Sequence, residues 1–435
     1  MLNLLKSAYD KAPKKTLKFL KYIPNRVLFG NSYTDHDYQI SFDKHIVKNN
    51  LLNILNYAHK NTAYGKENIP KKIYIEEVHD LLQELPLISS QDISQNLDYY
   101  TSQEFQNKKS YLTTTGGTGR NPTTILLSNE SYGMEWKHMH HIWSHSNYSK
   151  KNNLNLTLRG KSLKNNKLLE YSPIYNELIV DTFKVKNENF KQFIEILKKY
   201  PITHIHGYPS LVKEFMHYFK EYDYIPPNIE GILLGSEGAT IEDKKSITDF
   251  FNAKVLHWYG QTEKVTLAVD TENNNLFKVY TSYGYPREVE GELVCTSFIN
   301  KALPLINYRT GDSAQIIEDD QHIYLKDLKG RWGKDFIYLN KEKKIPTSSI
   351  NLHSVIQDEI LFYQIKQNEY AKLHISILPK SHASAEFTNL KDNFRNEMKK
   401  SLKEFELEVE IVREQDIMRS VRGKMLMLIQ NLTVI

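Results

Sequence analysis

The chain of 435 residues has very little cysteine: Cys295 is the only one. A single cysteine excludes an internal disulfide framework and a cysteine-rich metal site. Cys295 lies in an apolar stretch, residues 292–298, which predicts a strand in which it acts as a small buried hydrophobe. This composition fits a protein of the reducing cytoplasm.

Long hydrophobic runs are also missing. No stretch approaches the ~18 consecutive apolar residues of a membrane span, and the N-terminus lacks the apolar segment of a signal peptide. We therefore expect no export by that route. Residues 2–29 mix leucines and a phenylalanine with lysines, which allows a basic amphipathic helix in peripheral contact with an anionic membrane. Pro13 interrupts that pattern, and a helix packed on the protein body is the alternative.

Charge of one sign is not concentrated anywhere. The chain has 57 Lys and Arg residues against 52 Asp and Glu, a formal net charge of +5, and its lysines are scattered. Without a basic block interleaved with aromatic residues, nucleic acid is not an expected partner. A mild attraction to anionic substrates such as ATP remains.

The order of hydrophobic patterns predicts an α/β fold. Residues 44–60 and 75–82 have helical spacing, and from 111 to 312 short apolar strands alternate with helices at 189–200, 210–222 and 242–251. Beyond residue 330 the order changes to a strand at 372–378, a helix at 385–405 and a strand at 406–412. We expect a large layered domain with mixed and parallel sheets, residues 1–333, followed by a small mobile α+β lid domain, residues 334–435.

A Thr- and Gly-rich loop carries the first chemical signal. The segments at 110–112 and 123–127 read as strands, so residues 113–120 form a hairpin tip. The loop is not of the Walker type, because Arg120 is followed by Asn121 and Pro122 rather than by a helix. Its backbone amides, hydroxyls and one cation suit phosphate, although such tips are also common solvent-exposed turns. The phosphate-binding candidates are Thr114, Thr115, Gly116, Gly117, Thr118, Gly119 and Arg120.

Four more segments follow the loop in the chain. They are Gly235-Ser236-Glu237-Gly238, Tyr259-Gly260-Gln261-Thr262-Glu263, Tyr308-Arg309-Thr310-Gly311-Asp312 with Gly330-Arg331 and Asp335 after it, and residues 419–424, which end in Lys424. In this order they resemble the AMP-forming adenylating superfamily of acyl-CoA synthetases, peptide-synthetase adenylation domains and luciferases. Together with residues 23–30, 55–64, 85–88 and 206–210, they are most similar to its phenylacetate-CoA ligase-like branch, in particular the members of capsular polysaccharide biosynthesis.

The resemblance implies a reaction and a role for each residue. An acid ligase of this type joins a carboxylic acid to AMP, releases pyrophosphate, and passes the acyl group to coenzyme A or another nucleophile. By resemblance, Gly235, Ser236 and Glu237 border the adenine, with Tyr259 stacked on it beside Gly260. Thr262 contacts the α-phosphate and Glu263 binds Mg²⁺, a hard cation that prefers oxygen ligands.

The remaining roles fall on residues near the hinge and the C-terminus. Asp312 accepts hydrogen bonds from both ribose hydroxyls, Arg331 contacts ribose or phosphate, Asp335 is the pivot, and Lys424 bridges the carboxylate and the α-phosphate. Taken alone, Thr262 and Glu263 also suit a helix N-cap with an acidic first turn, and Gly311-Asp312 suits an ordinary surface turn.

Histidines and two departures from the family pattern leave alternatives open. His138, His140, His141 and His145 surround two tryptophans and suit a metal site, the lining of an acyl pocket, or a helix surface; His204 and His206 are candidates for a pocket wall. Asn307 stands where relatives carry Arg, and residues 341–345 lack the glycine expected along the pantetheine tunnel. Direct transfer to an amine or amino sugar of a polysaccharide is therefore an alternative to coenzyme A. A non-catalytic nucleotide-binding scaffold is a third, against which Lys424 argues.

Overall fold

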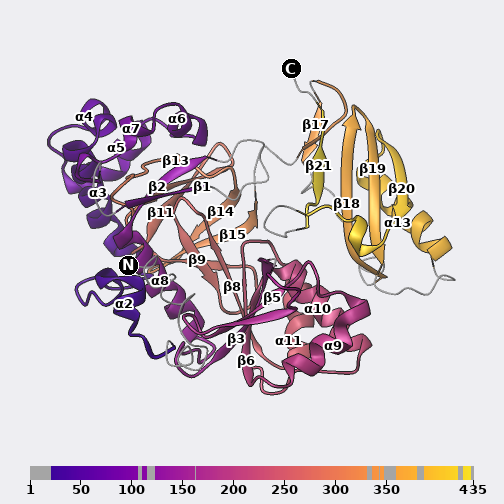
Figure 1. Ribbon diagram of the computed structural model, residues 1–435. Helices are drawn as coiled ribbons and strands as arrows, with labels where there is room; N and C mark the ends of the chain where they lie inside the picture. The colour runs from indigo at the N-terminus through magenta and orange to yellow at the C-terminus, as the bar shows by residue number, and fades with distance from the viewer. Residues whose placement is uncertain are drawn as a thin grey trace.

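The structure is a computed structural model that describes residues 21–105, 110–114, 123–161, 163–330, 336–341, 343–346, 359–379, 387–419 and 425–432. Residues 21–330 form a body of helices and sheets, and the described residues from 336 to 432 form a separate C-terminal lobe beside it (Figure 1). Among the described helices, none is long and apolar enough to cross a membrane.

A ten-stranded sheet runs through the body in the order β14-β15-β10-β9-β8-β7-β6-β3-β5-β4. Its central strands β5, β3, β6, β7 and β8 are parallel, and antiparallel strands extend it on both sides. The strand bounds are β3 Leu154–Lys161, β4 Leu169–Ser172, β5 Glu177–Asp181, β6 Ile202–Gly207, β7 Gly231–Gly235, β8 Lys254–Gly260, β9 Leu267–Asp270, β10 Phe277–Val279, β14 Ser313–Glu318 and β15 Ile323–Lys329.

Helices cover both faces of the parallel strands, as the βα alternation predicted. Ile232 and Leu234 of β7 pack with one group of helices, whereas Leu233 between them packs with another helix on the opposite face. Each fully buried side chain of this size contributes about 1.5–3 kcal/mol. The first group is α9 Phe190–Leu197, α10 Pro209–Glu221 and α11 Ile241–Phe251, and the opposite helix is α8 Asn129–Ser144 (Figure 1).

The N-terminal helices pack with smaller sheets into a second core of the body. The sheets are an antiparallel hairpin, which confirms the predicted strands around the Thr- and Gly-rich loop, and a three-stranded antiparallel sheet that buries Cys295. The helices of this core are α3 Val47–Asn61, α4 Ala63–Asn68, α5 Val78–Glu84, α6 Ser90–Gln95 and α7 Leu97–Tyr100; the strands are β1 Ser110–Thr114, β2 Thr124–Ser128, β11 Gly284–Val289, β12 Glu292–Ser297 and β13 Tyr308–Arg309. Helix α2 Asn25–Phe29 packs on α8 instead, where Phe29 stacks on Trp136.

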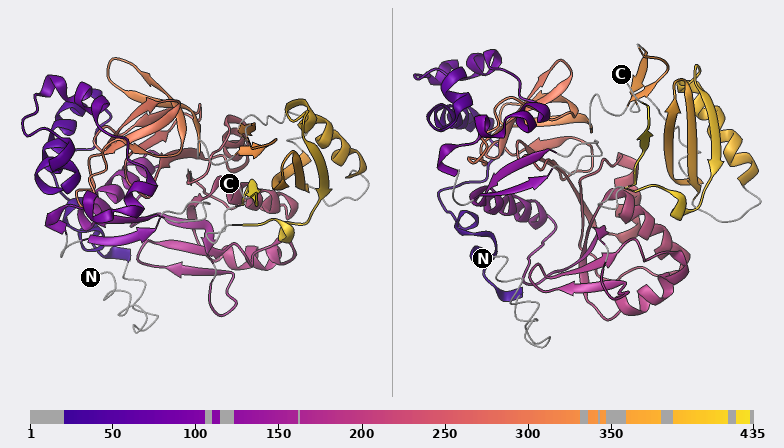
Figure 2. Two further views of the ribbon diagram at one scale, coloured as in Figure 1. Left: turned by 90° about the horizontal axis from the view of Figure 1, so that it is seen from above. Right: turned by 45° about the horizontal axis from the view of Figure 1, so that its top comes forward.

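The C-terminal lobe has a hydrophobic core of its own. Figure 2 shows its four-stranded sheet and one helix standing apart from the body in both views. The elements are β16 Phe336–Tyr338, β17 Lys344–Pro346, β18 Ile360–Glu369, β19 Lys372–Pro379, α13 Phe387–Ser401, β20 Glu406–Ile411 and β21 Leu428–Gln430. The predicted strand, helix and strand of this region correspond to β19, α13 and β20.

Candidate nucleotide and acid site

The second and third motifs follow neighbouring parallel strands. β7 ends at Gly235 and β8 ends at Gly260, so the two segments lie at the same edge of the sheet. A Cβ at Gly235 would lie 2.4 Å from the Trp258 ring, which requires glycine there. Ser236 takes a left-handed backbone conformation, φ 68°, that turns the chain away from the strand.

Tyr259 and Asp312 join the third motif to the fourth. The Tyr259 hydroxyl donates a 2.6 Å hydrogen bond to Asp312 Oδ2, and the Gln261 side-chain amide donates to the same hydroxyl. Burial, and then the Asp312 charge, raise the pKa of Tyr259 well above its ordinary value, so this hydroxyl stays protonated. The backbone of Asp312 is held as well, since its N–H donates to Thr310 Oγ1 (3.1 Å) and its carbonyl accepts from Leu293 (2.8 Å).

Thr262 and Glu263 lie in a turn, not at the start of a helix. The backbone N–H of Lys264 donates to the carbonyl of Gln261 over 3.1 Å, and the helix N-cap interpretation of this segment is therefore wrong. Tyr308 donates a 3.0 Å hydrogen bond to Glu263 Oε1. Glu263 is only partly buried, and its carboxylate oxygens are ligands of the kind that Mg²⁺ prefers.

Hydrogen bonds tie the second motif segment, around Ser236 and Glu237, to its surroundings. Glu237 Oε2 accepts from the backbone N–H of Ser210 at the start of α10 (3.1 Å), and its carbonyl interacts with His257 Nε2 (2.9 Å). Arg159 of β3 donates to Ser236 Oγ over 3.4 Å. These contacts connect the edge of β7 with β3 and β8.

Asn307, the departure from the family pattern, has a structural role. It is fully buried at φ 54°, a left-handed conformation that asparagine tolerates better than most residues. Its side-chain amide donates to the carbonyls of Leu82 (2.6 Å) and Leu85 (3.1 Å), and its oxygen accepts from Arg287 (2.7 Å). Asn307 therefore anchors the end of α5 to the three-stranded sheet.

Several predicted site residues lie outside the described residues. They are Thr115, Gly116, Gly117, Thr118, Gly119 and Arg120 of the loop, Arg331, Asp335 and Lys424. Thr114 ends β1, where its backbone pairs with Thr124 of β2. The described residues thus bring together the Gly235, Tyr259, Glu263 and Asp312 segments, and the roles of the others stay predictions.

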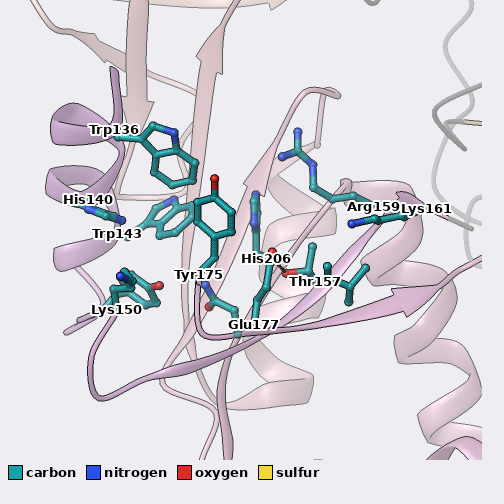
Figure 3. Close-up of a pocket in the computed structure, with 13 residues that line it drawn as sticks. Trp136, His140, Trp143, Lys150, Thr157, Arg159, Lys161, Tyr175, Glu177 and His206 are labelled. Atoms are coloured by element: carbon teal, nitrogen blue, oxygen red, sulfur yellow. Dashed lines mark hydrogen bonds between the residues drawn. The ribbon is translucent and has the colours of Figure 1, made fainter. Parts of the chain in front are cut away.

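A cavity of about 220 Å³ lies beside these segments, between α8 and the strands β3, β5 and β6 (Figure 3). Its walls are aromatic and polar, with Ile179 as the one aliphatic side chain. Ring contacts of His206 and Trp143 with Trp258, at 5.6 and 6.3 Å, join the cavity to the strand that ends at Tyr259. The cavity is lined by Trp136, His140, Trp143, Tyr148, Lys150, Asn155, Thr157, Arg159, Lys161, Tyr175, Glu177, Ile179 and His206.

The structure separates the histidines by role. His140 and His206 line the cavity, whereas His138 is buried against Tyr38 and Ser282, and His141 interacts with the Tyr280 hydroxyl at 2.9 Å. His204 interacts with the carbonyl of Ser146 at 3.0 Å. No group of three or more metal-ligating side chains occurs in the described part of the chain.

Burial shifts the titratable groups of the cavity. It lowers the pKa of His140 to about 4 and, with the nearby Arg159 charge, lowers that of His206 well below its ordinary value, so both rings are neutral at pH 7. Burial also lowers the pKa of Lys150 to about 8 and raises that of Glu177. Sequence reasoning missed Lys150, Tyr175 and Glu177 as lining residues.

A buried charge cluster connects the C-terminal lobe to the body. Arg419 donates to Glu214 of α10 (2.8 Å) and to Glu414 of its own lobe (3.1 Å), and Glu214 is fully buried. Lys186 pairs with both glutamates, and the Tyr218 hydroxyl donates to Glu414. Burial and the adjacent Glu214 raise the pKa of Glu414 to about 8, whereas the two cations lower that of Glu214. Arg419 begins the segment that ends in Lys424.

Comparisons with known proteins identify the fold. No family model matches the chain. It is 22% identical over 445 residues to Protein CapK of Staphylococcus aureus, covering 93% of each protein. A crystal structure of 2-hydroxyisobutyryl-CoA ligase in the postadenylation state, in complex with R3-HIB-AMP, superposes with a TM-score of 0.65 at 15% identity, covering 89% of each chain. The GH3.15 acyl acid amido synthetase superposes with a TM-score of 0.54 at 12% identity, covering 85% of this chain and 86% of that one.

The chain has the fold of these two solved structures, and the predicted α/β fold is therefore confirmed. Its similarity to Protein CapK extends over nearly the whole length of both proteins.

Proposed function

We propose that the protein is an ATP-dependent acid ligase that converts a small carboxylic acid to an acyl-adenylate and releases pyrophosphate. The observation that carries this proposal is the meeting of Tyr259, Asp312 and Glu263 at one edge of the sheet, next to a cavity of about 220 Å³. Segments that are distant in the sequence meet there, and their side chains are suited to bind ribose, Mg²⁺ and phosphate. The adenylate-forming fold of the two solved relatives supports the same reaction.

In the proposed reaction, a carboxylate oxygen of the acid attacks the α-phosphorus of ATP. A new oxygen–phosphorus bond forms, the bond from that phosphorus to the bridging oxygen breaks, and pyrophosphate leaves with the electron pair. Asp312 would orient the ribose through its two oxygens, and residues 113–120 would hold the outer phosphates with backbone amides. Thr262 would contact the α-phosphate, and Lys424 would approach the reacting oxygens when the C-terminal lobe is docked.

Glu263 would hold Mg²⁺, which when bound would offset the charge of the phosphates. Tyr308 restrains this carboxylate through its 3.0 Å hydrogen bond to Glu263 Oε1. The Tyr308 hydroxyl is itself kept protonated, because burial and the Glu263 charge raise its pKa.

The second half-reaction transfers the acyl group to coenzyme A or to an amine, and releases AMP. Each acceptor has a precedent among the similar solved structures, since one is a CoA ligase and the other is an acyl acid amido synthetase. The resemblance of the sequence to members of capsular polysaccharide biosynthesis supports a place in surface polysaccharide modification, in which an amino sugar is the amine acceptor. We further propose that residues 1–333 and 334–435 act as separate domains in the cytoplasm; the independent hydrophobic core of the C-terminal lobe supports this division.

Direct detection of the intermediate tests the proposal. The purified protein is incubated with ATP, Mg²⁺, inorganic pyrophosphatase and a panel of small acids, and the quenched mixture is analysed by mass spectrometry for acyl-AMP. A mass that matches one acid joined to AMP is expected, and adding coenzyme A or amines then shows which acceptor releases AMP. ADP and acyl phosphate as the products would contradict an AMP-forming reaction.

A further inference from the structure

One strand in the middle of the sheet has an unusually polar face. Along β3, Leu154, Leu156 and Leu158 pack into the core with α9 and α10, whereas the alternate residues face the cavity. Those alternate residues are Asn155, Thr157, Arg159 and Lys161. Because β3 pairs with a strand on each side and α8 lies over the cavity, Asn155 and Thr157 are buried on this face, whereas Arg159 and Lys161 near the end of β3 are exposed.

The neighbouring strands add further polar groups on the same face. Asn155 is the register partner of Glu177 in β5, and Thr157 is the register partner of His206 in β6. Thr157 donates a 2.7 Å hydrogen bond to Glu177 Oε2. Figure 3 shows Thr157, Glu177 and His206 together at one end of the cavity, opposite Trp136. The sheet side of the cavity is therefore a polar floor.

Two groups of this floor accept hydrogen bonds. Glu177 presents a carboxylate of which one oxygen is engaged by Thr157. Asn155 is 2% exposed, and its Oδ1 has no hydrogen bond partner among the described residues. A buried acceptor without a partner is costly, so a ligand that donates to it is favoured.

Other lining groups donate, or both donate and accept. The indole N–H of Trp143 is buried without a partner in the described structure, and the ring of Trp143 lies 5.0 Å from that of Tyr148. His206 is neutral, so one ring nitrogen donates and the other accepts. A ligand group that both donates and accepts fits this set.

The charges and the walls of the cavity limit which ligands it can bind. Lys150, Arg159 and Lys161 contribute three positive charges against the single carboxylate of Glu177, which disfavours a cationic amine. A hydroxyl group donates and accepts without carrying charge, whereas an ammonium only donates. The aromatic walls and a volume of about 220 Å³, above the roughly 150 Å³ that holds benzene, admit a short or single-ring skeleton.

Building on the proposed function, we propose that the acid taken by this cavity is a small hydroxy acid, whose hydroxyl group is recognised by Glu177, Asn155 and His206. The carboxylate of the acid points toward Arg159, which contacts Ser236 at the nucleotide side. A site that recognises the hydroxyl group with a charged acceptor discriminates against the parent acid, which is the same acid without the hydroxyl group. When the parent acid binds, the buried polar groups of the site stay unpaired.

The test compares acids of one skeleton on the wild-type protein. Butyrate, β-hydroxybutyrate, γ-hydroxybutyrate and γ-aminobutyrate form one set, and benzoate with para-hydroxybenzoate forms another. Two readouts are taken: kcat/KM in acid-dependent ATP–pyrophosphate exchange, and quenching of tryptophan fluorescence without ATP, which reports binding beside Trp136 and Trp143. We expect at least one hydroxy acid to exceed its parent and amino analogue by roughly ten-fold or more in both readouts.

Variants test whether residues of the cavity cause the preference for the hydroxy acid over the parent acid. Glu177→Gln keeps the size of the side chain and is expected to bring the ratio of hydroxy acid to parent acid toward one. Thr157→Val, which removes the hydroxyl that holds Glu177, is expected to lower the same ratio. Glu170→Gln is the matched control, since Glu170 lies on the adjacent strand β4 in a surface pair with Lys167, outside the cavity; its ratio should stay at the wild-type value.

The outcomes separate this inference from the proposed function. Exchange supported best by a parent acid or by γ-aminobutyrate overturns the hydroxy-acid inference and leaves adenylation standing. Preferential binding of hydroxy acids without exchange by any acid supports the cavity assignment and overturns adenylation. Neither binding nor exchange with any acid overturns both.

Discussion

The hydroxyl of Tyr259 donates a 2.6 Å hydrogen bond to Asp312, although the two residues are 53 positions apart in the chain. The bond links the end of β8 to the segment that follows β13, and it fixes one carboxylate oxygen of Asp312. A carboxylate held in this way is ready to accept neutral donors such as ribose hydroxyls, since little side-chain freedom is lost on binding.

The first prediction concerns the affinity for ATP. Asp312→Ala should weaken ATP binding by roughly ten-fold or more, because hydrogen bonds to a charged acceptor contribute about 1.5–3 kcal/mol each. Tyr259→Phe should cause a smaller loss, and the double variant should lose less than the sum of the two single variants, since the residues are in contact. Calorimetric titration with ATP measures all three. Wild-type affinity in Asp312→Ala would remove this residue from the nucleotide site.

The second prediction concerns Lys424. Lys424→Ala should reduce adenylation by about a hundred-fold or more while ATP affinity and melting temperature stay near wild type, because a charge that acts on the reacting oxygens contributes to the transition state rather than to binding. Pyrophosphate exchange and calorimetry are run on the same preparation. Lys403→Ala, which removes an exposed lysine of the same lobe, is the control and should keep full exchange. Equal loss in both variants would point to general damage to the lobe.

The third prediction is a pH dependence of lobe docking. Docking raises the pKa of Glu414 from its ordinary 4.5 to about 8, through burial and the adjacent Glu214, while Lys186, Arg419 and the Tyr218 hydroxyl face it. Between these two values the docked state binds more protons than the undocked state, so raising the pH in that window should favour undocking.

Fluorescence transfer between the body and the C-terminal lobe measures this pH dependence of docking. The only cysteine is buried, so cysteines introduced at the exposed Lys199 and Lys403 can be labelled selectively. Transfer should fall as the pH rises from about 5 to 9 in the wild type and should stay flat in Glu414→Gln, which cannot titrate. A rise in transfer with pH, or the same slope in Glu414→Gln, would refute the role of this carboxyl group.

The fourth prediction concerns the connection between the lobes. Trypsin should cut first within residues 334–344, where Lys341, Lys343 and Lys344 are exposed, and an ATP analogue with a substrate acid should slow that cut. The turn at residues 164–167, with Lys164 and Lys167 exposed, is an internal reference that ligands should not protect. First cleavage at the reference turn, without an effect of ligands, would favour a rigid protein and the scaffold alternative.

Much of the fold could be predicted because local patterns determine it. Strand alternation around residues 113–120 predicted the β1–β2 hairpin, and helical spacing followed by apolar runs predicted the pairs of α10 with β7 and α11 with β8. Each of these signals lies within about 30 residues, where periodicity and turn chemistry are informative. The proximity of Tyr259 to Asp312 followed only from the resemblance, since no local pattern connects them.

The cavity and the buried charge cluster could not be predicted from the sequence, for a physical reason. The alternation of Leu154 to Lys161 marks a strand with one polar face, but the sequence does not say that α8 covers that face and turns it into a cavity floor. Likewise Glu214 and Arg419 are unremarkable charges until the C-terminal lobe docks on α10 and buries them. The sequence marks Asn307 only as a departure from the family pattern, and its left-handed backbone and its hydrogen bonds to α5 become evident only in the structure.

Acid-dependent exchange of labelled pyrophosphate into ATP is the sharpest test of the proposed adenylation. The assay needs only the first half-reaction, so the identity of the final acyl acceptor does not affect it. We expect exchange that requires Mg²⁺ and one small acid, is stopped by a chelator, and is lost in Asp312→Ala at an ATP concentration that saturates the wild type. Exchange that proceeds equally without any acid, or no exchange across the full panel of acids although ATP binds, would contradict it.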